Sequence, residues 1–284
     1  MIQRSIESVQ EQTYKNIELV IVDDSPKDFP DRDQVKSYIQ GLNDPRIKYI
    51  QNEKNMGGAL ARNVGIFAST GDYVSFLDDD DRYLPKKIEK QLNFMVENGY
   101  DMSFENLVLK NENEKVVDVR EFHDIWSMER KEFLKYHIIH HATGTPTFMF
   151  KKEKLEEIGG FDDAIMGQEF YLMLKTIESG MKIGYFDSHD VVAYRHSGES
   201  ISNGKNKIKG QHILQKKKEE YYHLLNNKQK RFVSMRNFAV LSVAYYRNNM
   251  LGEAFKNLLA AFFEAPIQFI GASFAFIVNV LKFR

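Results

Sequence analysis

The stretch Phe76-Leu77-Asp78-Asp79-Asp80-Asp81 places four carboxylates in a row at the end of an apolar segment that starts at Tyr73. A short apolar run of this kind is typical of a buried β-strand, and Pro85 is well placed to begin a helix soon after it. In open α/β sheets, ligands bind beyond the carboxyl ends of the strands. The stretch therefore predicts a strand that delivers negative charge to the binding edge of a sheet. A solvated acidic turn that caps the next helix is the simpler alternative.

Alternate residues of this acidic stretch are expected to act together. In an extended segment, residues two apart point the same way, so Asp78 and Asp80 can face one site. Carboxylate oxygens are the ligands that Mg²⁺ and Mn²⁺ prefer, and such an ion bridges them to substrate phosphates. Asp79 and Asp81 would point elsewhere or support the other two. The pattern predicts a site for a divalent cation, with Asp78 and Asp80 as ligands.

A second acidic pair, Asp23-Asp24, ends the apolar run 17–22. If both runs are strands of one sheet, both acidic ends open onto the same edge. A carboxylate there could accept a hydrogen bond from a nucleobase imide or a ribose hydroxyl. Taken alone, an Asp-Asp-Ser-Pro turn is as often an ordinary helix cap or loop.

The segment Asn55-Met56-Gly57-Gly58 opens a predicted helix, with Arg62 about one turn further on. Backbone N–H groups and the helix dipole make such an N-terminus favourable for anions. The segment is therefore a candidate contact for a diphosphate. Ordinary helix-start glycines with a surface arginine are the alternative.

Strands and helices are expected to alternate along the first two hundred residues, which predicts an α/β fold: a mostly parallel, Rossmann-like sheet flanked by helices and more mixed in its second half. Helices are expected at 31–42, 57–68, 85–98 and 167–179, and strands at 17–22, 47–50, 73–77, 102–105, 116–119, 147–150 and within 182–194. We expect a catalytic domain at residues 1–204. A C-terminal helical region at 205–284 should contain a helix pair at 232–247 and 252–264.

Composition narrows the class of protein. The net charge of −1 argues against a chain-wide basic surface for nucleic acid. The absence of cysteine excludes disulfides, thiolate metal sites and a cysteine nucleophile, which fits a reducing cytoplasm. Residues 1–12 carry Arg4, Glu7 and Glu11 and lack the apolar core of a secretory signal. We expect a cytoplasmic protein.

The C-terminal region could bring the protein to a membrane. Seventeen uncharged residues separate Glu264 from Lys282, which is borderline for a membrane span. Ahead of them, residues 205–231 hold nine Lys or Arg against two Glu. Such a stretch favours an anionic inner leaflet, so peripheral attachment to the inner face of the cell membrane is expected. A helix packed on the catalytic domain is the alternative.

Two further features stay open. His140-His141 precede a predicted strand and could line an acceptor pocket, although adjacent residues of an extended chain face opposite ways. Trp126 could stack on a sugar ring or anchor a loop. We assign neither feature a functional role.

The order of these motifs resembles glycosyltransferase family 2, the inverting GT-A transferases of bacterial polysaccharide synthesis. The resemblance runs from about Ile2 to Ser202. It is carried by the motifs Gln12-Thr13-Tyr14, Val22-Asp23-Asp24-Ser25, Asn55-Met56-Gly57, Ala61-Arg62-Asn63, Gly71-Asp72-Tyr73, Phe76 to Asp81 and Gly159-Gly160-Phe161-Asp162.

The resemblance implies a role for each motif. The nucleotide sugar would be bound by Asp23, Asp24, Asn55, Gly57, Arg62, Asp78 and Asp79. Asp78 and Asp80 would form the Asp-x-Asp site for Mn²⁺ or Mg²⁺, with His196 as a further ligand to the metal or a contact of the diphosphate. The general base would be Glu169, which stands where family members usually carry aspartate. A charge that merely stabilises the start of a helix is the other interpretation of Glu169.

The chain departs from the family pattern at its beginning. Family members start with a short apolar strand that lies centrally in the sheet, whereas this chain starts inside the helix that follows. Loss of that strand would leave buried backbone groups without partners, at about 1–3 kcal/mol each. We expect the natural start codon to lie upstream.

The expected function is metal-dependent inverting transfer of a hexosyl or N-acetylhexosaminyl group. The donor would be a nucleotide-diphosphate sugar, and the acceptor a glycan carried on a polyprenyl diphosphate, as in capsule, cell-wall or lipopolysaccharide synthesis. Nucleotidyl transfer also uses clustered aspartates and a metal, but it would release pyrophosphate. A non-catalytic homologue that only binds sugar nucleotides is the remaining alternative.

Overall fold

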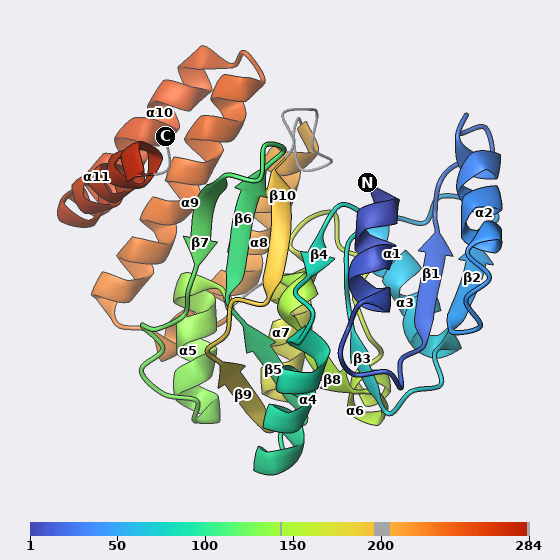
Figure 1. Ribbon diagram of the computed structural model, residues 1–284. Coiled ribbons are helices and arrows are strands. Elements are labelled where there is room, and N and C mark those ends of the chain that lie inside the picture. Colours follow the sequence, from blue (N-terminus) through green and yellow to red (C-terminus); the bar gives the residue numbers. More distant parts are fainter. Residues whose placement is uncertain (143, 196–204, 283–284) are drawn as a thin grey trace. The chain divides into compact units, whose positions relative to one another are not determined.

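The computed structural model describes residues 1–142, 144–195 and 205–282, and its contacts divide the chain into two compact units (Figure 1). The first unit comprises Met1–Val108, Gly144–Ala164 and Tyr171–Ala193. The second comprises Leu109–Thr143, Ile165–Phe170 and Tyr194–Arg284. The expected division into domains at residue 204 stays a prediction.

Helices and strands alternate along the first half of the chain, as the sequence indicated. In order they are α1 (Ile2–Gln10), β1 (Leu19–Asp23), α2 (Arg32–Gly41), β2 (Ile47–Gln51), α3 (Gly58–Ala68), β3 (Tyr73–Ser75), β4 (Arg82–Tyr83), α4 (Lys87–Asn98), β5 (Met102–Glu105), β6 (Leu107–Asn111) and β7 (Val116–Arg120). The main difference from the predicted elements is the short β3. The expected strand 73–77 ends two residues early, so Phe76 and Leu77 already belong to the loop of residues 76–81, here called the acidic loop.

The second half of the chain is more helical. It contains α5 (Arg130–His140), a 3₁₀ turn (Thr145–Thr147), β8 (Met149–Lys151), α6 (Lys152–Glu157), α7 (Gln168–Glu178), β9 (Ile183–Phe186), β10 (Val191–Arg195), α8 (Lys205–Glu219), a second 3₁₀ turn (Tyr222–Leu224), α9 (Asn227–Arg247), α10 (Leu251–Glu264) and α11 (Pro266–Lys282). The expected helix pair at 232–247 and 252–264 is therefore present as α9 and α10.

The strands pair in both senses. β1 and β2 run parallel, with Leu19 opposite Ile47, and β5 and β9 run parallel, with Met102 opposite Ile183. β8 runs antiparallel to both β3 and β5, and β4 runs antiparallel to β10. Parallel pairing is thus less extensive than the alternation of strands and helices indicated, because β8 enters the sheet between β3 and β5 in the reverse direction.

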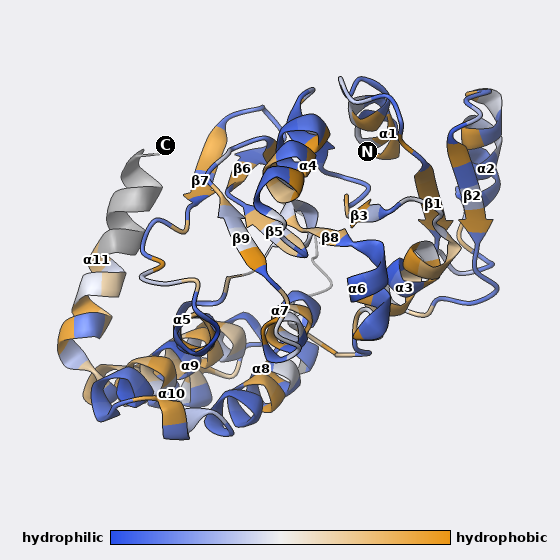
Figure 2. Ribbon diagram, turned by 90° about the horizontal axis from the view of Figure 1, so that it is seen from below, coloured by the Kyte–Doolittle hydropathy of each residue, from blue (hydrophilic) through white to orange (hydrophobic). Residues whose placement is uncertain are grey.

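The core of the first unit lies around β5 and β8. All four residues of β5 are buried, and Phe104, Phe148 and Phe150 are 0% exposed. Figure 2 shows hydrophobic residues along β1 as well. Burial of each large apolar side chain contributes about 1.5–3 kcal/mol, so these strands form the rigid support of the loops at their ends.

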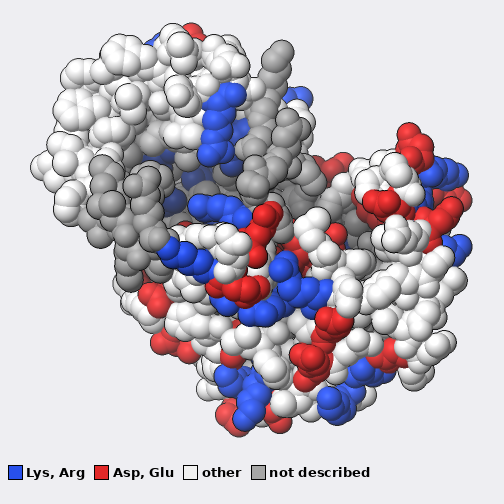
Figure 3. Space-filling model, turned by 45° about the horizontal axis from the view of Figure 1, so that its top comes forward, with Lys and Arg blue, Asp and Glu red and all other residues white. Residues whose placement is uncertain are grey.

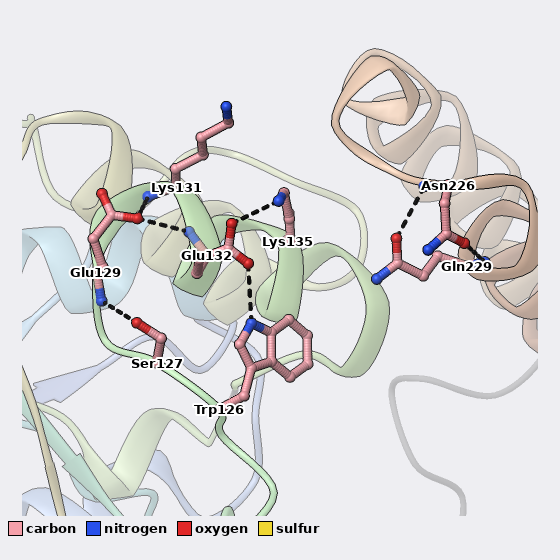
Figure 4. A network of polar contacts seen from close by, with 8 residues as sticks. All are labelled: Trp126, Ser127, Glu129, Lys131, Glu132, Lys135, Asn226 and Gln229. Atoms are coloured by element: carbon pink, nitrogen blue, oxygen red, sulfur yellow. Dashed lines mark hydrogen bonds and ion pairs between the residues drawn. The ribbon is translucent and has the colours of Figure 1, made fainter.

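The second unit is mainly helical, and side chains cap its helices (Figure 4). Glu129 accepts hydrogen bonds from the backbone N–H groups of Lys131 and Glu132 at the start of α5. Asn226 and Gln229 form a reciprocal capping box at the start of α9. Each such cap contributes about 1 kcal/mol. Trp126 donates to Glu132 at 3.2 Å, so its indole anchors the loop that leads into α5.

The C-terminal helices pack through small residues. α10 buries Ala254, Asn257 and Ala261, and a cluster of Met235, Ala261 and Ala265 joins it to α9. Within the residues that the structure describes, no single helix is long and apolar enough to cross a membrane. Only α10 and the start of α11 together reach that hydropathy, and they meet at a bend of 113°.

His137 is fully buried in the second unit as a neutral imidazole. Its Nδ1 accepts a hydrogen bond from the backbone N–H of Ala142 at 3.2 Å, and its Nε2 lies 3.0 Å from the carbonyl oxygen of Phe170. This pattern requires the proton on Nε2 and leaves no place for a second proton. Burial lowers the pKa of His137 to about 3.

We therefore expect acid to destabilise the protein through His137. Below pH 6.5, the ordinary pKa of histidine, His137 is protonated in the unfolded chain, whereas in the folded protein it stays neutral down to about pH 3. The free energy of unfolding therefore falls as the pH falls. The loss is about 1.4 kcal/mol per pH unit. Urea unfolding at pH 7 and pH 5 should show a drop that is about 2 kcal/mol smaller in His137→Gln than in the wild type. The exposed His212→Gln should keep the wild-type drop, and equal drops in all three proteins would contradict the assignment.

Candidate active site

The acidic loop follows β3 and closes on itself as a turn. The backbone N–H of Asp81 donates to the carbonyl of Asp78 at 3.1 Å. Arg62, in the second turn of α3, pairs with the carboxylate of Asp78 at 2.5 Å, and the Asp78 side chain remains 38% exposed. Of the expected site residues, Arg62 and Asp78 are thus brought into direct contact by the fold.

Side chains of helix α1 donate hydrogen bonds to the backbone carbonyls of the acidic loop. The hydroxyl of Ser5 donates to the carbonyl of Asp79 at 2.6 Å, and the guanidinium of Arg4 donates to the carbonyl of Asp80. Further on, Gln12 donates to the carbonyl of Leu84 at 2.8 Å. Because the loop carbonyls are occupied on this side, the loop backbone is fixed before any ligand binds.

Crowding of like charges makes the loop a suitable place for a cation. Partial burial and repulsion from Asp80 and Asp78 raise the pKa of Asp79. Within the described residues, no group of three or more metal-ligating side chains is gathered. Two loop carboxylates fit Mg²⁺ or Mn²⁺ as a partial shell, to be completed by oxygens of a substrate or water.

Asp23 is the last residue of β1, and its carboxylate accepts hydrogen bonds from neighbouring residues of the protein. Its carboxylate accepts hydrogen bonds from Ser25 N at 3.0 Å, the Tyr49 hydroxyl at 2.6 Å and Gln51 at 3.3 Å. Burial alone would raise the pKa of Asp23, but these hydrogen bonds together lower it. Asp23 therefore fixes the end of β1 against β2.

Asp24 fixes the loop that leads into α3. Its carboxylate accepts from Asn52 at 2.8 Å, from the N–H of Met56 at 3.0 Å and from the N–H of Gly57 at 2.8 Å. The Asn55 side chain donates to its carbonyl at 2.8 Å. Asp24, Asn55 and Gly57 are therefore brought together as expected. In the residues described, however, their polar groups bind one another, and nucleoside binding by Asp23 and Asp24 stays a prediction.

Asn63, in the next motif on α3, explains why a glycine stands at position 160. Asn63 donates to the carbonyl of Phe161 and accepts from its N–H, both at 2.8 Å. Gly160 has a φ of +65°, and a Cβ atom there would lie 2.4 Å from the Asn63 amide oxygen. Lys175 donates to the carbonyl of Gly160 at 2.7 Å. The guanidinium of Arg62 lies 5.6 Å from the centre of the Phe161 ring, so this motif also supports Arg62.

A buried polar group behind the acidic loop was missed by the sequence analysis. Lys87 is 0% exposed and donates to the Ser75 hydroxyl at 2.7 Å, with its ammonium 4.1 Å from the centre of the Tyr83 ring. Glu105 is equally buried, and within the described residues neither of its carboxylate oxygens makes a hydrogen bond of standard geometry, although the nearby backbone of Asp190 favours its ionised form. Burial lowers the pKa of Lys87 to about 8 and raises that of Glu105 to about 8. The sequence patterns of α4 and β5 are ordinary. Only the position of Lys87 and Glu105 on the buried faces of these elements could have predicted that their side chains are buried.

Glu169 belongs to the second unit and lies half-buried in the first turn of α7. Within the described part of the chain, its carboxylate has no hydrogen-bonded or ion-paired partner. His196, expected near the metal or the diphosphate, lies outside the described residues.

The fold and this site define the class of the protein. The strands form separate sheets, with β1 beside β2 and β3 beside β8, so the two acidic strand ends do not belong to one sheet as expected. Parallel and antiparallel sheets flanked by helices, with acidic loops after β1 and β3, are nevertheless the GT-A fold of glycosyltransferases. The chain belongs to glycosyl transferase family 2, whose model matches residues 1–159.

Relatives of this chain include proteins of polysaccharide synthesis. An uncharacterized glycosyltransferase of Methanocaldococcus jannaschii is 32% identical over 182 residues, which are 64% of this chain and 61% of that protein. The putative teichuronic acid biosynthesis glycosyltransferase TuaG of Bacillus subtilis is 32% identical over 72% of this chain and 77% of its own length. Residues 1–349 of S. aureus TarS, solved with UDP-GlcNAc, share the fold with a TM-score of 0.58 at 15% identity, over 90% of this chain and 85% of that one.

The close approach at Gly160 generates a stability prediction. Gly160→Ala combines a left-handed φ with a clash against Asn63, whereas Gly159→Ala has a φ of +74° and open space around the new Cβ. The backbone conformation costs about 1–2 kcal/mol in both variants. The clash should cost Gly160→Ala a further 1–3 kcal/mol or so, measured as the difference in unfolding free energy in urea. Equal destabilisation of the two variants would show that the contact with Asn63 is unimportant.

Proposed function

We propose that the protein catalyses metal-dependent inverting transfer of a sugar from a nucleotide-diphosphate sugar to a glycan acceptor. The observation that carries this proposal is the acidic loop, held rigidly by α1 and joined to α3 through Arg62 and Asp78. Such a site offers oxygen ligands and a cationic side chain beside a helix N-terminus. These are the groups that a diphosphate leaving group needs.

The N-terminus of α3 would receive the diphosphate. Asp24 already binds the N–H groups of Met56 and Gly57, so the anion would meet the first turn that begins at Gly58. The helix dipole favours negative charge at this position. Arg62 lies one turn further on, and its guanidinium, which pairs with Asp78, would also be placed to meet a diphosphate.

Asp78 and Asp80 would hold a divalent cation, which when bound stabilises the negative charge that develops on the leaving group. Before the donor binds, the ion pair with Arg62 neutralises Asp78. The carboxyl of Asp79, whose pKa is raised, adds to the demand for positive charge in the loop.

Glu169 would act as the general base. It would accept the proton of the acceptor hydroxyl as that oxygen attacks the anomeric carbon from the side opposite the diphosphate, which inverts the configuration. Its carboxylate is half-buried and has no partner among the described residues, so it is available for a substrate proton. The relation to TuaG supports a polysaccharide acceptor of the cell envelope.

The decisive measurement is nucleoside diphosphate release from UDP-, GDP- and dTDP-sugars with Mn²⁺ and lipid-linked glycan acceptors. Asp80→Asn should lower the rate by roughly 100-fold or more, because several kcal/mol of transition-state stabilisation depend on the cation. Glu169→Gln should lower it by about 10²–10⁴-fold while donor binding persists. Asp163→Asn, an exposed carboxylate near the glycine pair, should leave the rate unchanged.

Two results would move the assignment elsewhere. Pyrophosphate release would identify a nucleotidyltransferase. Donor binding without release, with every acceptor tested, would support a non-catalytic homologue.

We further propose that the C-terminal helices attach the protein to the inner face of the cell membrane. In α10 the distribution of apolar side chains is the opposite of that in an ordinary surface helix. Its small residues are buried, and its large apolar residues face outward. Among the described side chains, the outward-facing large apolar residues of α9, α10 and α11 are Val240, Val243, Tyr246, Leu251, Phe255, Leu258, Leu259, Phe262, Phe263, Ile267, Ile270 and Phe274.

The surface of these helices fits a lipid partner of negative charge. On the face drawn in Figure 3, acidic and basic side chains are mixed over the lower part, whereas few charged side chains are visible on the helices at the upper left. Lys216 on α8 and Lys256 on α10, which lies 3.8 Å from Glu253, are both exposed to solvent and could meet anionic headgroups. Apolar side chains bordered by lysines are typical of surfaces that lie in a membrane interface.

Vesicle flotation tests this attachment. The wild type should float with vesicles that contain anionic lipid, and Phe255→Ser with Phe263→Ser should reduce binding at least about tenfold, since each buried phenylalanine contributes about 1.5–3 kcal/mol. Phe67→Ser removes a similarly exposed ring from α3 and should not change binding. A wild type that fails to float but loses a dimer on the double substitution would identify a second copy of the chain as the partner.

A further inference from the structure

Within the described residues, a cluster of nitrogen-bearing side chains in the second unit, formed by Lys218, Arg236 and His141, has no carboxylate paired with it. It is built by α5, α8 and α9 around the ring of Phe170, the residue that follows Glu169. The imidazole of His141 lies 4.9 Å from the centre of that ring, and the ammonium of Lys218 lies 5.9 Å from it. Arg236 donates to the carbonyl of Ile139 at 2.7 Å, at the end of α5.

Lys218 is turned inward by the periodicity of α8. The buried face of this helix carries Gln211, Leu214, Gln215 and Lys218, at the i, i+3, i+4 and i+7 positions that a packed helix normally gives to apolar residues. This face packs closely against residues 165–170 of the same unit, because a Cβ at Gly210 would lie only 2.7 Å from Met166. The neighbouring Lys216 points to solvent, so the inward position of Lys218 is specific.

The charge of Lys218 is uncompensated within the described residues. The side chain is 4% exposed, and it has no hydrogen-bond acceptor or carboxylate beside it there. Burial and the charge of Arg236 lower the pKa of Lys218 to about 7. Burial of an unpaired ammonium costs several kcal/mol, which a bound anion would offset.

His141 and Arg236 complete the arrangement. The Nε2 atom of His141 is buried and has no hydrogen-bond partner in the described part of the chain, and burial lowers the pKa of this imidazole well below its usual value. A neutral imidazole with Nε2 protonated would donate to an anion. Arg236 uses one Nη for the carbonyl of Ile139, and the rest of its fork stays available. Asp124, a carboxylate near this end of α5, lies 3.9 Å from His140 and accepts a hydrogen bond from the Tyr136 hydroxyl.

We propose that Lys218, Arg236 and His141 form a subsite that binds a phosphate group of the acceptor substrate. Donors of these three kinds, gathered around Phe170 and the end of α5, suit the oxygens of a phosphate, and Phe170 offers an apolar wall. The acceptor is the source of the phosphate because the cluster packs on the residue next to Glu169, the proposed base for the acceptor hydroxyl. In that assignment the inference rests on the proposed transferase function.

Isothermal titration with inorganic phosphate tests the subsite directly. The wild type and Lys216→Met should bind phosphate with equal affinity. Lys218→Met and His141→Phe should each bind it at least about tenfold more weakly, since a charge-assisted hydrogen bond contributes about 1.5–3 kcal/mol. Methionine replaces the buried ammonium at similar volume, so Lys218→Met should fold and melt at a higher temperature than the wild type without phosphate. Equal phosphate affinity in the wild type and Lys218→Met would overturn the subsite.

Competition identifies the source of the phosphate. Farnesyl phosphate should displace inorganic phosphate, UDP should not, and Lys218→Met should raise the KM for a lipid-linked acceptor while the KM for the donor stays unchanged. Displacement by UDP with a raised donor KM would overturn the acceptor assignment. Lysine-dependent phosphate binding in a protein that transfers no sugar would refute the transferase proposal and leave the subsite standing.

Discussion

Repulsion between carboxylates is the constraint around which the first unit is built. Two acidic strand ends, Asp23-Asp24 and the stretch 78–81, must stay folded before any substrate or metal arrives. Helix α3 stabilises both: Asp24 binds the N–H groups at its start, and Arg62 neutralises Asp78 one turn later. The helix dipole and the arginine thus work together on the two ends. The site is therefore preorganised by groups that are also suited to a diphosphate.

The motifs that characterise the family are connected in space by backbone hydrogen bonds. Gln12 binds the chain at the start of α4, and Asn63 holds the backbone of Phe161. Gly160 allows this approach because any side chain would strike Asn63. Several motif residues therefore serve to hold the loops in place, and fewer of them are available for direct contact with a substrate. Removal of such a residue affects binding through the position of its neighbours.

In the second unit the electrostatic constraint comes from buried nitrogen-bearing side chains, whereas in the first unit it comes from carboxylates. Its core contains Lys218, His137 and His141, three nitrogen-bearing side chains whose pKa values are all lowered by burial. His137 is satisfied as a neutral group, whereas Lys218 and His141 are not. The reversed face of α10 is a comparable departure, because large apolar side chains meet solvent there. Both departures reduce the stability of the isolated chain, and both are explained if the unit meets a phosphate and a lipid surface.

The sequence by itself determined the alternation of strands and helices, the acidic strand ends and the helix that begins at Gly58. These are local properties: apolar runs, carboxylates and glycines act through neighbouring residues, and their period along the chain is sufficient to predict them. The tertiary structure alone decided that β8 runs antiparallel, that Asp24 is occupied by the α3 loop, and that Lys87 and Lys218 are buried. These features depend on contacts between residues far apart in the chain. No local pattern distinguishes a lysine that faces the core from one that faces water, because the difference lies in what packs against it.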